Sequence, residues 1–292
     1  MTDWTQITEH ISACIHENFA LQRADSLSGG CINEAWCLID DKRRFFVKLN
    51  SNNRQTAMFS AEFAGLLVLY ESGAIRVPKP LCYGATGNAS YLVTEYLPLT
   101  AHINQRILGR QLAELHRHCS THYGWERDNT LGTTLQQNTW SSDWSAFWRE
   151  HRLGYQLQLA ARNGYGGILQ KRGEQLLSVL DQFLSHRPQA SLLHGDLWSG
   201  NIAGLPDGTP VIFDPAVYHG DRECDLAMTE LFGGFGRDFY AAYREQWPAD
   251  EGYRLRKDLY NLYHVLNHLN LFGGGYLRQS QHLIDQLLAE VH

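Results

Sequence analysis

The sequence lacks several features that would indicate particular classes of protein. Its 25 lysine and arginine residues stand against 31 acidic ones, giving a formal net charge of -6, and they form no long basic run. The sequence therefore predicts no nucleic-acid surface. No apolar run approaches the roughly 18 residues of a membrane-spanning helix, and the N-terminus lacks the basic start and apolar core of a signal peptide. We expect neither nucleic acid nor membrane as a partner.

Cysteine is scarce and irregularly spaced. The six cysteines, at positions 14, 31, 37, 82, 119 and 224, form no C-x-x-C pair. In a chain of this length they predict reduced thiols in a cytoplasmic protein rather than a disulfide framework. With 43% hydrophobic and 19% charged residues, the chain is expected to be ordered and globular. This composition still allows an anionic ligand, because phosphate binding needs only backbone N–H groups and one or two cations.

The first third of the chain alternates short apolar segments with turn signals. Residues 35–40 and 44–49 predict two strands joined as a hairpin. Residues 57–72 carry apolar side chains at helical spacing and end before a glycine, which predicts a helix. Two further strands are predicted over residues 81–85 and 91–97, the second of which ends at a proline.

After residue 98 the chain is mostly helical. Amphipathic helices are predicted over residues 105–117, 143–162 and 174–184. Two short apolar runs, 191–193 and 211–213, interrupt this part, and each leads into polar residues. We therefore expect an α+β chain with a small β-rich N-lobe over residues 1–97 and a larger helical C-lobe over residues 98–292.

The polar residues behind the two short runs form a pattern typical of phosphoryl transfer. The first run leads into Asp196, with Asn201 five positions later, and the second leads into Asp214. A phosphoryl-transfer site needs a carboxylate to orient the attacking hydroxyl, and oxygen ligands that hold Mg²⁺ against the phosphates. Asp196 fits the first role, and Asn201 with Asp214 fits the second. An isolated D-x-x-x-x-N is more often a capped turn, but here three features coincide in order.

The N-terminal third is then expected to hold ATP. Lys48 lies on a predicted strand, like the phosphate-binding lysine of kinases, and Glu62 on the following helix is its expected ion-pair partner. A lone strand lysine or helix glutamate usually faces water; the order of these residues relative to the predicted catalytic loop favours the functional interpretation.

Two further features of the same third fit an ATP site more weakly. Gly29 and Gly30 lie in a glycine-rich turn where backbone amides could approach phosphate, although a plain hairpin turn would look similar. Cys31 in that turn would lie near Lys48 and is a candidate for redox sensitivity. Glu95 and Tyr96 lie where kinases offer backbone groups to adenine, a prediction that rests on position alone.

The motifs together resemble the fructosamine (ketosamine) kinase family, within the protein-kinase-like group that includes aminoglycoside and choline kinases. Residues 194–201 read His-Gly-Asp-Leu-Trp-Ser-Gly-Asn, similar to the family's catalytic loop with its tryptophan. Residues 214–223, 231–235 and 263–273 resemble its metal loop and C-terminal segments. The resemblance runs nearly end to end and implies a two-lobed protein-kinase-like fold, with ATP and Mg²⁺ as cofactors.

The resemblance also implies the reaction, which is transfer of the ATP γ-phosphate to the 3-hydroxyl of a ketosamine. The substrate would be a small ketosamine or a glycated protein lysine, and the activity would contribute to protein deglycation. Trp198 is then a candidate platform for the sugar or the lysine stem, or else a packing residue of the helical lobe. Asp225 resembles the aspartate that holds the catalytic-loop backbone.

Other functions stay open from the residues. The chain could be a kinase for another small hydroxyl substrate, such as choline or an aminoglycoside, or an inactive nucleotide-binding scaffold. A protein Ser/Thr kinase is disfavoured, because no D-F-G or A-P-E sequence follows the loop. His264 and His268 stand four apart, which is a metal-ligand spacing, but with apolar neighbours they are expected to be core positions.

Overall fold

The computed structural model describes residues 4–27, 33–52 and 55–291. The chain forms two compact units, one of Met1–Asn104 with Ala203–Asp214 and the other of Gln105–Ile202 with Pro215–His292. The first unit holds the large β-sheet and the second is mainly helical, which is the expected α+β organisation. A segment that follows Asn201 thus returns to the first unit, and the functional division of the chain after residue 97 stays a prediction.

The first unit is built on a five-stranded antiparallel sheet with strand order β1-β2-β3-β5-β4. Its strands are β1 (Arg23–Leu27), β2 (Glu34–Ile39), β3 (Arg44–Asn50), β4 (Pro80–Ala85) and β5 (Ser90–Glu95). The predicted hairpin is confirmed, since β2 pairs with β3 and Leu38 lies opposite Phe45. The sequence reasoning did not predict β1, whose pattern of half-buried and exposed residues gives little alternation.

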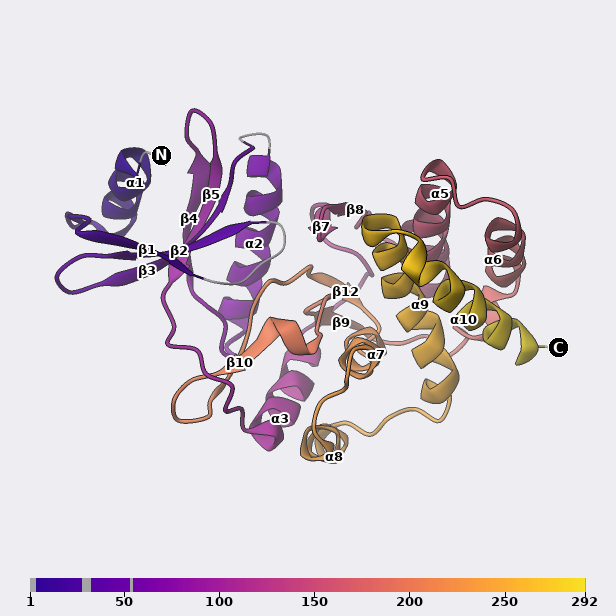
Figure 1. The fold of residues 1–292 in the computed structure, drawn as a ribbon. Helices are drawn as coiled ribbons and strands as arrows, with labels where there is room; N and C mark the ends of the chain where they lie inside the picture. Colours follow the sequence, from indigo (N-terminus) through magenta and orange to yellow (C-terminus); the bar gives the residue numbers. More distant parts are fainter. Residues whose placement is uncertain (1–3, 28–32, 53–54, 292) are drawn as a thin grey trace. The chain divides into compact units, whose positions relative to one another are not determined.

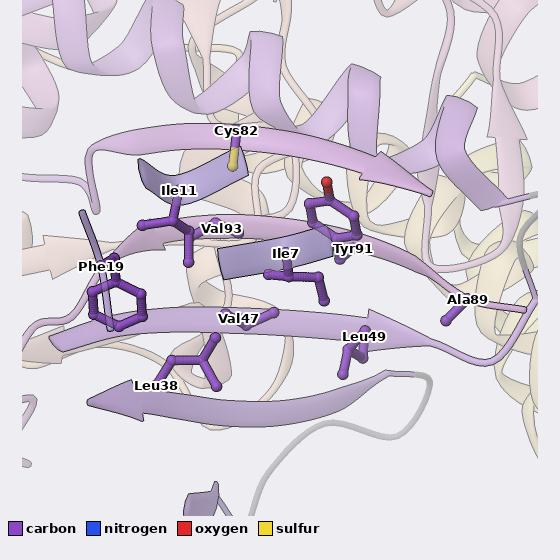
Figure 2. Packing of buried hydrophobic residues seen from close by; sticks show 10 residues of the cluster. All are labelled: Ile7, Ile11, Phe19, Leu38, Val47, Leu49, Cys82, Ala89, Tyr91 and Val93. Atoms are coloured by element: carbon purple, nitrogen blue, oxygen red, sulfur yellow. The ribbon is translucent and has the colours of Figure 1, made fainter. Parts of the chain in front are cut away.

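Two helices, α1 (Thr5–Ile15) and α2 (Thr56–Ser72), lie on opposite sides of this sheet (Figure 1). Side chains alternate between the two faces of a strand, so Val47 and Leu49 of β3 share one face. There they form a buried cluster with Ile7 and Ile11 of α1 (Figure 2). Lys48, between them in the sequence, points to the other face, where it forms an ion pair with Glu62 of α2.

A small hairpin completes the first unit. It consists of β10 (Ile202–Gly204) and β11 (Pro210–Ile212). The N–H of Thr100 donates to Gly204 O at 2.7 Å, and Val211 forms a parallel bridge with Arg76. A Cβ on Gly204 would lie 1.8 Å from His102 O, so this close approach requires glycine. The hairpin is thereby fixed to the segment before β4 and to the segment after β5.

The second unit is mainly helical. Its α-helices are α3 (Gln105–His116), α4 (Trp144–Phe147), α5 (Gly154–Arg162), α6 (Ile168–Ser178), α7 (Glu223–Leu231), α8 (Arg237–Gln246), α9 (Tyr253–Phe272) and α10 (Leu277–Ala289). Its strands are β6 (Cys119–Ser120), β7 (Asn129–Leu131), β8 (Thr134–Gln136), β9 (Ala190–Leu193) and β12 (Tyr218–Gly220). The strand order β12-β9-β6 buries β9 completely. Within the described ranges, no helix combines the length and apolar character needed to cross a membrane.

Two predicted helices differ from the observed ones. Residues 143–162 form α4, a π-helix (Trp148–Leu153) and α5 rather than one α-helix. The N–H of Gly154 donates to Arg149 O, and a Cβ on Gly154 would lie 2.3 Å from that oxygen, so the wide turn needs glycine. The prediction of a helix over residues 174–184 was wrong at both ends. The helix α6 begins six residues earlier and ends at Ser178, and a 3₁₀ turn (Leu180–Gln182) follows it.

Candidate functional site

Lys48 joins two carboxylates within the first unit. Its Nζ donates to Glu62 Oε1 at 2.5 Å and also to Asp214 Oδ1. The side chains of Lys48 and Glu62 are each only 14% exposed, whereas that of Asp214 is 45% exposed. The structure thus brings together three of the predicted site residues, and Asp214 is the one that offers free surface to a ligand.

The charges of this trio depend on one another. Burial opposes the charge of Lys48, but the Asp214 and Glu62 carboxylates raise the pKa of its ammonium above the usual value. Burial, together with the Asp214 charge, raises the pKa of Glu62, and the Lys48 ammonium opposes this rise. Lys48 is therefore a fixed cation, and it balances negative charge that would otherwise be costly to bury.

Asp214 has an unusual backbone conformation. Its φ angle is +57°, one of three positive values among non-glycine residues of the described chain. Aspartate tolerates the left-handed region better than most residues, although the conformation still costs energy. It follows β11 after a single intervening residue. The sequence placed Asp214 at the end of this strand but gave no sign of the left-handed turn that directs it to Lys48.

Asp196 and Asn201 lie together in the loop that follows β9 in the second unit. The Asn201 side-chain amide donates to Asp196 O at 2.9 Å and to Asp196 Oδ2 at 3.1 Å. Asn201 is buried, while Asp196 is half-buried. The amide nitrogen of Asn201 thus restrains the Asp196 carboxylate, and its amide oxygen is the atom suited to a cation.

The backbone of this loop is held by Asp225 of α7. The Asp225 carboxylate accepts hydrogen bonds from the N–H of His194 at 2.7 Å and of Gly195 at 2.9 Å. Gly195 has a φ of +82°, and a Cβ there would lie 2.0 Å from Ala216 O. The expected support by Asp225 is therefore observed. His194 is fully buried, and its backbone N–H is one of the two groups that Asp225 holds.

A second layer of polar residues fixes Asp225 itself. His116 of α3 contacts Asp225 Oδ2 at 3.2 Å through Nε2, and its Nδ1 lies 2.8 Å from the Tyr243 hydroxyl. Burial works against ionisation of Asp225, but the hydrogen bond and charge of His116 and the Gly195 N–H lower its pKa. Sequence reasoning missed His116 and Tyr243, because nothing in their local sequence links them to a loop more than 70 residues from His116.

Trp198 lies in the same loop and is 38% exposed. Its ring meets Phe232 edge-on, with the ring centroids 6.3 Å apart. A Cβ on Gly200 would lie 2.3 Å from the indole, so Gly200 is needed for the ring to lie over the loop. One face of Trp198 is therefore packed, and a substantial part of the side chain stays accessible.

The remaining predicted residues were expected to contact the nucleotide. Gly29, Gly30 and Cys31 lie outside the described residues. The N–H of Glu95 donates to Lys79 O at 3.0 Å, and the Glu95 side chain contacts Arg76 at 2.7 Å. The Glu95 N–H is thus already used within the protein.

Tyr96 follows β5 directly, and the guanidinium of Arg44 lies 5.9 Å from the centroid of its ring. The adenine contact of Glu95 and Tyr96 stays a prediction. Of the histidine pair of α9, His264 is buried, as expected, and His268 is half-buried, with its Nδ1 2.8 Å from His264 O.

Comparison with known sequences gives full-length matches. The sequence model of the family described as fructosamine kinase matches residues 3–290. A probable ketoamine kinase of Synechocystis is 47% identical, with 98% of this chain and 97% of the relative covered. A chloroplastic protein-ribulosamine 3-kinase of Arabidopsis thaliana is 46% identical, with 92% of this chain and 83% of the relative covered.

Solved structures give the same picture of the fold. A Haemophilus somnus protein assigned as a fructosamine-3-kinase has a TM-score of 0.89 and 32% identity, over 98% of this chain and 97% of that one. A choline kinase of Streptococcus pneumoniae has a TM-score of 0.65 at 14% identity, over 97% and 98% of the two chains. At that identity the second likeness concerns the fold alone, which is protein-kinase-like, as expected.

Proposed function

Because the chain belongs to the fructosamine kinase family, we propose that it transfers the γ-phosphoryl group of ATP to the 3-hydroxyl of a ketosamine. Relatives named ketoamine kinase and protein-ribulosamine 3-kinase support the substrate class. The observation that carries the phosphotransfer chemistry is the contact of the Lys48 ammonium with both Glu62 and Asp214. A buried cation held by a helix glutamate, beside an exposed aspartate, is the phosphate-binding arrangement of kinases.

On this proposal Lys48 binds the phosphates of ATP. Its charge is permanent, because the two carboxylates raise its pKa, and Glu62 holds the ammonium in place from α2. Gly29 and Gly30 would contribute backbone N–H groups, and Glu95 and Tyr96 would line the adenine side. Residues 1–97 would supply the ATP-binding lobe, and residues 98–292 the catalytic and substrate-binding lobe.

The oxygen donors of Asn201 and Asp214 fit a magnesium ion. Both are hard oxygen ligands, as Mg²⁺ prefers, and no sulfur or imidazole belongs to the pair. The Asn201 nitrogen is used in the contact with Asp196, so its oxygen would be the ligand atom. Magnesium, when bound, would neutralise charge on the ATP phosphates. To bind the ion, Asp214 would give up part of its contact with the Lys48 ammonium.

Asp196 would act on the acceptor hydroxyl. Its carboxylate accepts a hydrogen bond from the substrate 3-hydroxyl, orients that oxygen toward the γ-phosphorus, and takes its proton as the new O–P bond forms and ADP leaves. The Asn201 amide fixes the carboxylate from one side, and Asp225 fixes the loop backbone behind it. The chain thus contributes positioning and proton acceptance.

Trp198 is proposed to contact the sugar or the lysine stem of the ketosamine. It is 38% exposed and lies two residues from Asp196. An indole gives a flat apolar face to the C–H side of a sugar or to a methylene chain. The contact with Phe232 keeps the ring from rotating freely. The substrate would be a small ketosamine or a glycated protein lysine.

ADP release against a panel of acceptors tests the proposal. The panel contains ribulosyl-lysine, fructosyl-lysine, choline and an aminoglycoside, each with Mg-ATP. We expect turnover with at least one of the two sugar-amines and background rates with the other two acceptors. Turnover with choline or the aminoglycoside alone would leave a kinase of different substrate class, and no turnover with any acceptor would favour an inactive nucleotide-binding scaffold.

A further inference from the structure

A cluster of soft metal-ligand side chains lies in the first unit, on the sheet face opposite Lys48. One ring nitrogen of His10 and the sulfurs of Cys14 and Cys82 all lie within 4.8 Å of one another. His10 and Cys14 are four residues apart on α1, so they project from one helix face. Cys82 belongs to β4 and joins the apolar cluster beneath that helix (Figure 2).

A fourth group orients this cluster. The Tyr91 hydroxyl lies 2.8 Å from His10 Nδ1, and Tyr91 is 4% exposed. A Cβ on Gly84 would lie 2.7 Å from the Tyr91 hydroxyl, so the glycine leaves the room that this hydroxyl occupies. Figure 2 shows Tyr91 and Cys82 on the adjacent strands β5 and β4. Metal-binding histidines are commonly oriented by such a hydrogen bond.

We propose that His10, Cys14 and Cys82 form a binding site for a thiophilic d¹⁰ cation such as Zn²⁺, with Tyr91 positioning the imidazole. Two thiolates and one imidazole, without a carboxylate, are ligands that favour such ions over Mg²⁺ or Ca²⁺. The net charge of a dithiolate with Zn²⁺ is zero, which suits the apolar surroundings. Lys48 lies on the opposite face of the same sheet, so it is not part of this site.

The spacing of the ligand atoms suits the ion. A tetrahedral site with zinc–sulfur bonds of about 2.3 Å holds its ligand atoms about 3.8 Å apart. Atoms that already lie within 4.8 Å of one another reach that spacing by small side-chain rotations. His10 and Cys14 are only partly buried, so an ion has a route to the cluster.

Binding releases protons in a simple balance. Cys14 and Cys82 are free cysteines and each bring one S–H group. Each loses its proton to solvent as its sulfur bonds the cation. No oxidation or reduction takes place. The bound ion would join α1 to β4 and stabilise the first unit.

Titration of the full chain with Co²⁺ and Zn²⁺ tests the proposal, in the presence of a phosphine reductant. We expect one equivalent of Co²⁺ to give a thiolate-to-metal charge-transfer absorption that Zn²⁺ displaces. Zn²⁺ at about a hundredfold excess over Kd should raise the Tm by about 5 °C. Cys14→Ser and Cys82→Ala should each abolish the absorption, and Tyr91→Phe should weaken Zn²⁺ binding about tenfold.

Two matched cysteine variants serve as controls. Cys37→Ala removes a buried thiol of the same unit, and Cys119→Ser removes an exposed thiol of the other unit. Both should keep the absorption. A second group, His186, Asp221 and Glu223, contains no sulfur, so it cannot produce this band. If Cys82→Ala does not fold, as judged by circular dichroism, Cys14→Ser provides the same test, and His10→Gln should weaken Co²⁺ binding.

Two results would overturn the inference. One is the absence of a thiolate band in the parent at one equivalent of Co²⁺. The other is a band that persists in Cys14→Ser and in His10→Gln while both variants keep the parental circular dichroism. Neither result depends on kinase activity, because the readouts are absorption and thermal stability.

Discussion

The Lys48 ammonium lies 2.5 Å from Glu62 Oε1, so a strand and the helix that follows it are joined by a buried ion pair. Glu62→Gln keeps the size of the side chain but removes the charge that holds the ammonium. We expect the KM for ATP to rise about tenfold, because Asp214 is then the one carboxylate that still holds Lys48 at its proposed phosphate-binding position. Steady-state kinetics at varied ATP concentration measure this.

The matched control for that change is Glu71→Gln. Glu71 lies on the same helix and is exposed, so its removal should leave the KM for ATP within twofold of the parental value, as surface changes usually do. An equal effect of both substitutions would mean that Glu62 acts through helix charge and not through Lys48.

Asp225 should stabilise the folded protein as well as hold the backbone of the loop after β9. Asp225→Asn replaces one carboxylate oxygen by an NH₂ group, which cannot accept a hydrogen bond. Because the N–H groups of His194 and Gly195 donate to different oxygens of Asp225, one of them loses its acceptor. A buried N–H left without an acceptor costs about 1–3 kcal/mol, and we expect a loss of that size in urea unfolding. Asp238→Asn, at an exposed position of α8, should change stability by less than about 0.5 kcal/mol.

His264 predicts a dependence of stability on pH. Burial, followed by the charge of His268, lowers its pKa to about 3, whereas an unfolded histidine has a pKa of about 6.5. The unfolded state therefore takes up a proton between these values while the folded state does not. The contribution of His264 to the free energy of unfolding is fully present above pH 6.5 and is lost as the pH falls toward 3. At pH 5 the loss is about 2 kcal/mol.

Urea unfolding at pH 7 and pH 5 measures this loss. His268, whose pKa burial also lowers, adds to it in the parent. In His264→Gln the difference between the free energies of unfolding at pH 7 and pH 5 should be about 2 kcal/mol smaller than in the parent. The exposed His122 serves as the control, because His122→Gln should show the parental difference in free energy of unfolding between pH 7 and pH 5. A parental pH dependence in His264→Gln would contradict this account.

Arg152 is a buried cation held by rings and carbonyls. Its guanidinium lies 4.1 Å from the centroid of the Tyr218 ring and 4.6 Å from that of Phe147, and it donates to Gln137 O at 2.5 Å. Arg152→Ala removes these contacts and leaves a cavity, so we expect a loss of about 3 kcal/mol or more in urea unfolding.

Arg172, which is only partly buried and pairs with Asp285, gives the comparison for Arg152. Arg172→Ala should cost at most about 1 kcal/mol, as surface ion pairs do. Similar losses for the two arginines would contradict the central packing role of Arg152.

The sequence predicted those parts of the fold whose signals are local. The hairpin of β2 and β3, the helix α2 and the ion pair of Lys48 with Glu62 follow from periodicity, turns and spacing. The left-handed Asp214 and the π-helix before Gly154 could not be predicted in this way, because both depend on close contacts between particular atoms.

The cluster of His10, Cys14 and Cys82 shows a different limit of sequence reasoning. Two of its members stand four apart, which is a readable spacing, but α1 itself was not predicted and Cys82 joins only through the sheet. A search for cysteine pairs close in sequence does not find such a site. Contacts between residues far apart in the chain are fixed by tertiary packing.

The central claim is that Asp196 accepts the proton of the substrate hydroxyl. The most direct measurement is the kcat of Asp196→Ala for ADP release with the best ketosamine acceptor, alongside ATP affinity from equilibrium binding. We expect kcat to fall by about 10²–10⁴-fold, with ATP affinity within about threefold of the parental value, which is about 0.7 kcal/mol. A kcat within tenfold of the parent, in a variant that binds ATP normally, would contradict it.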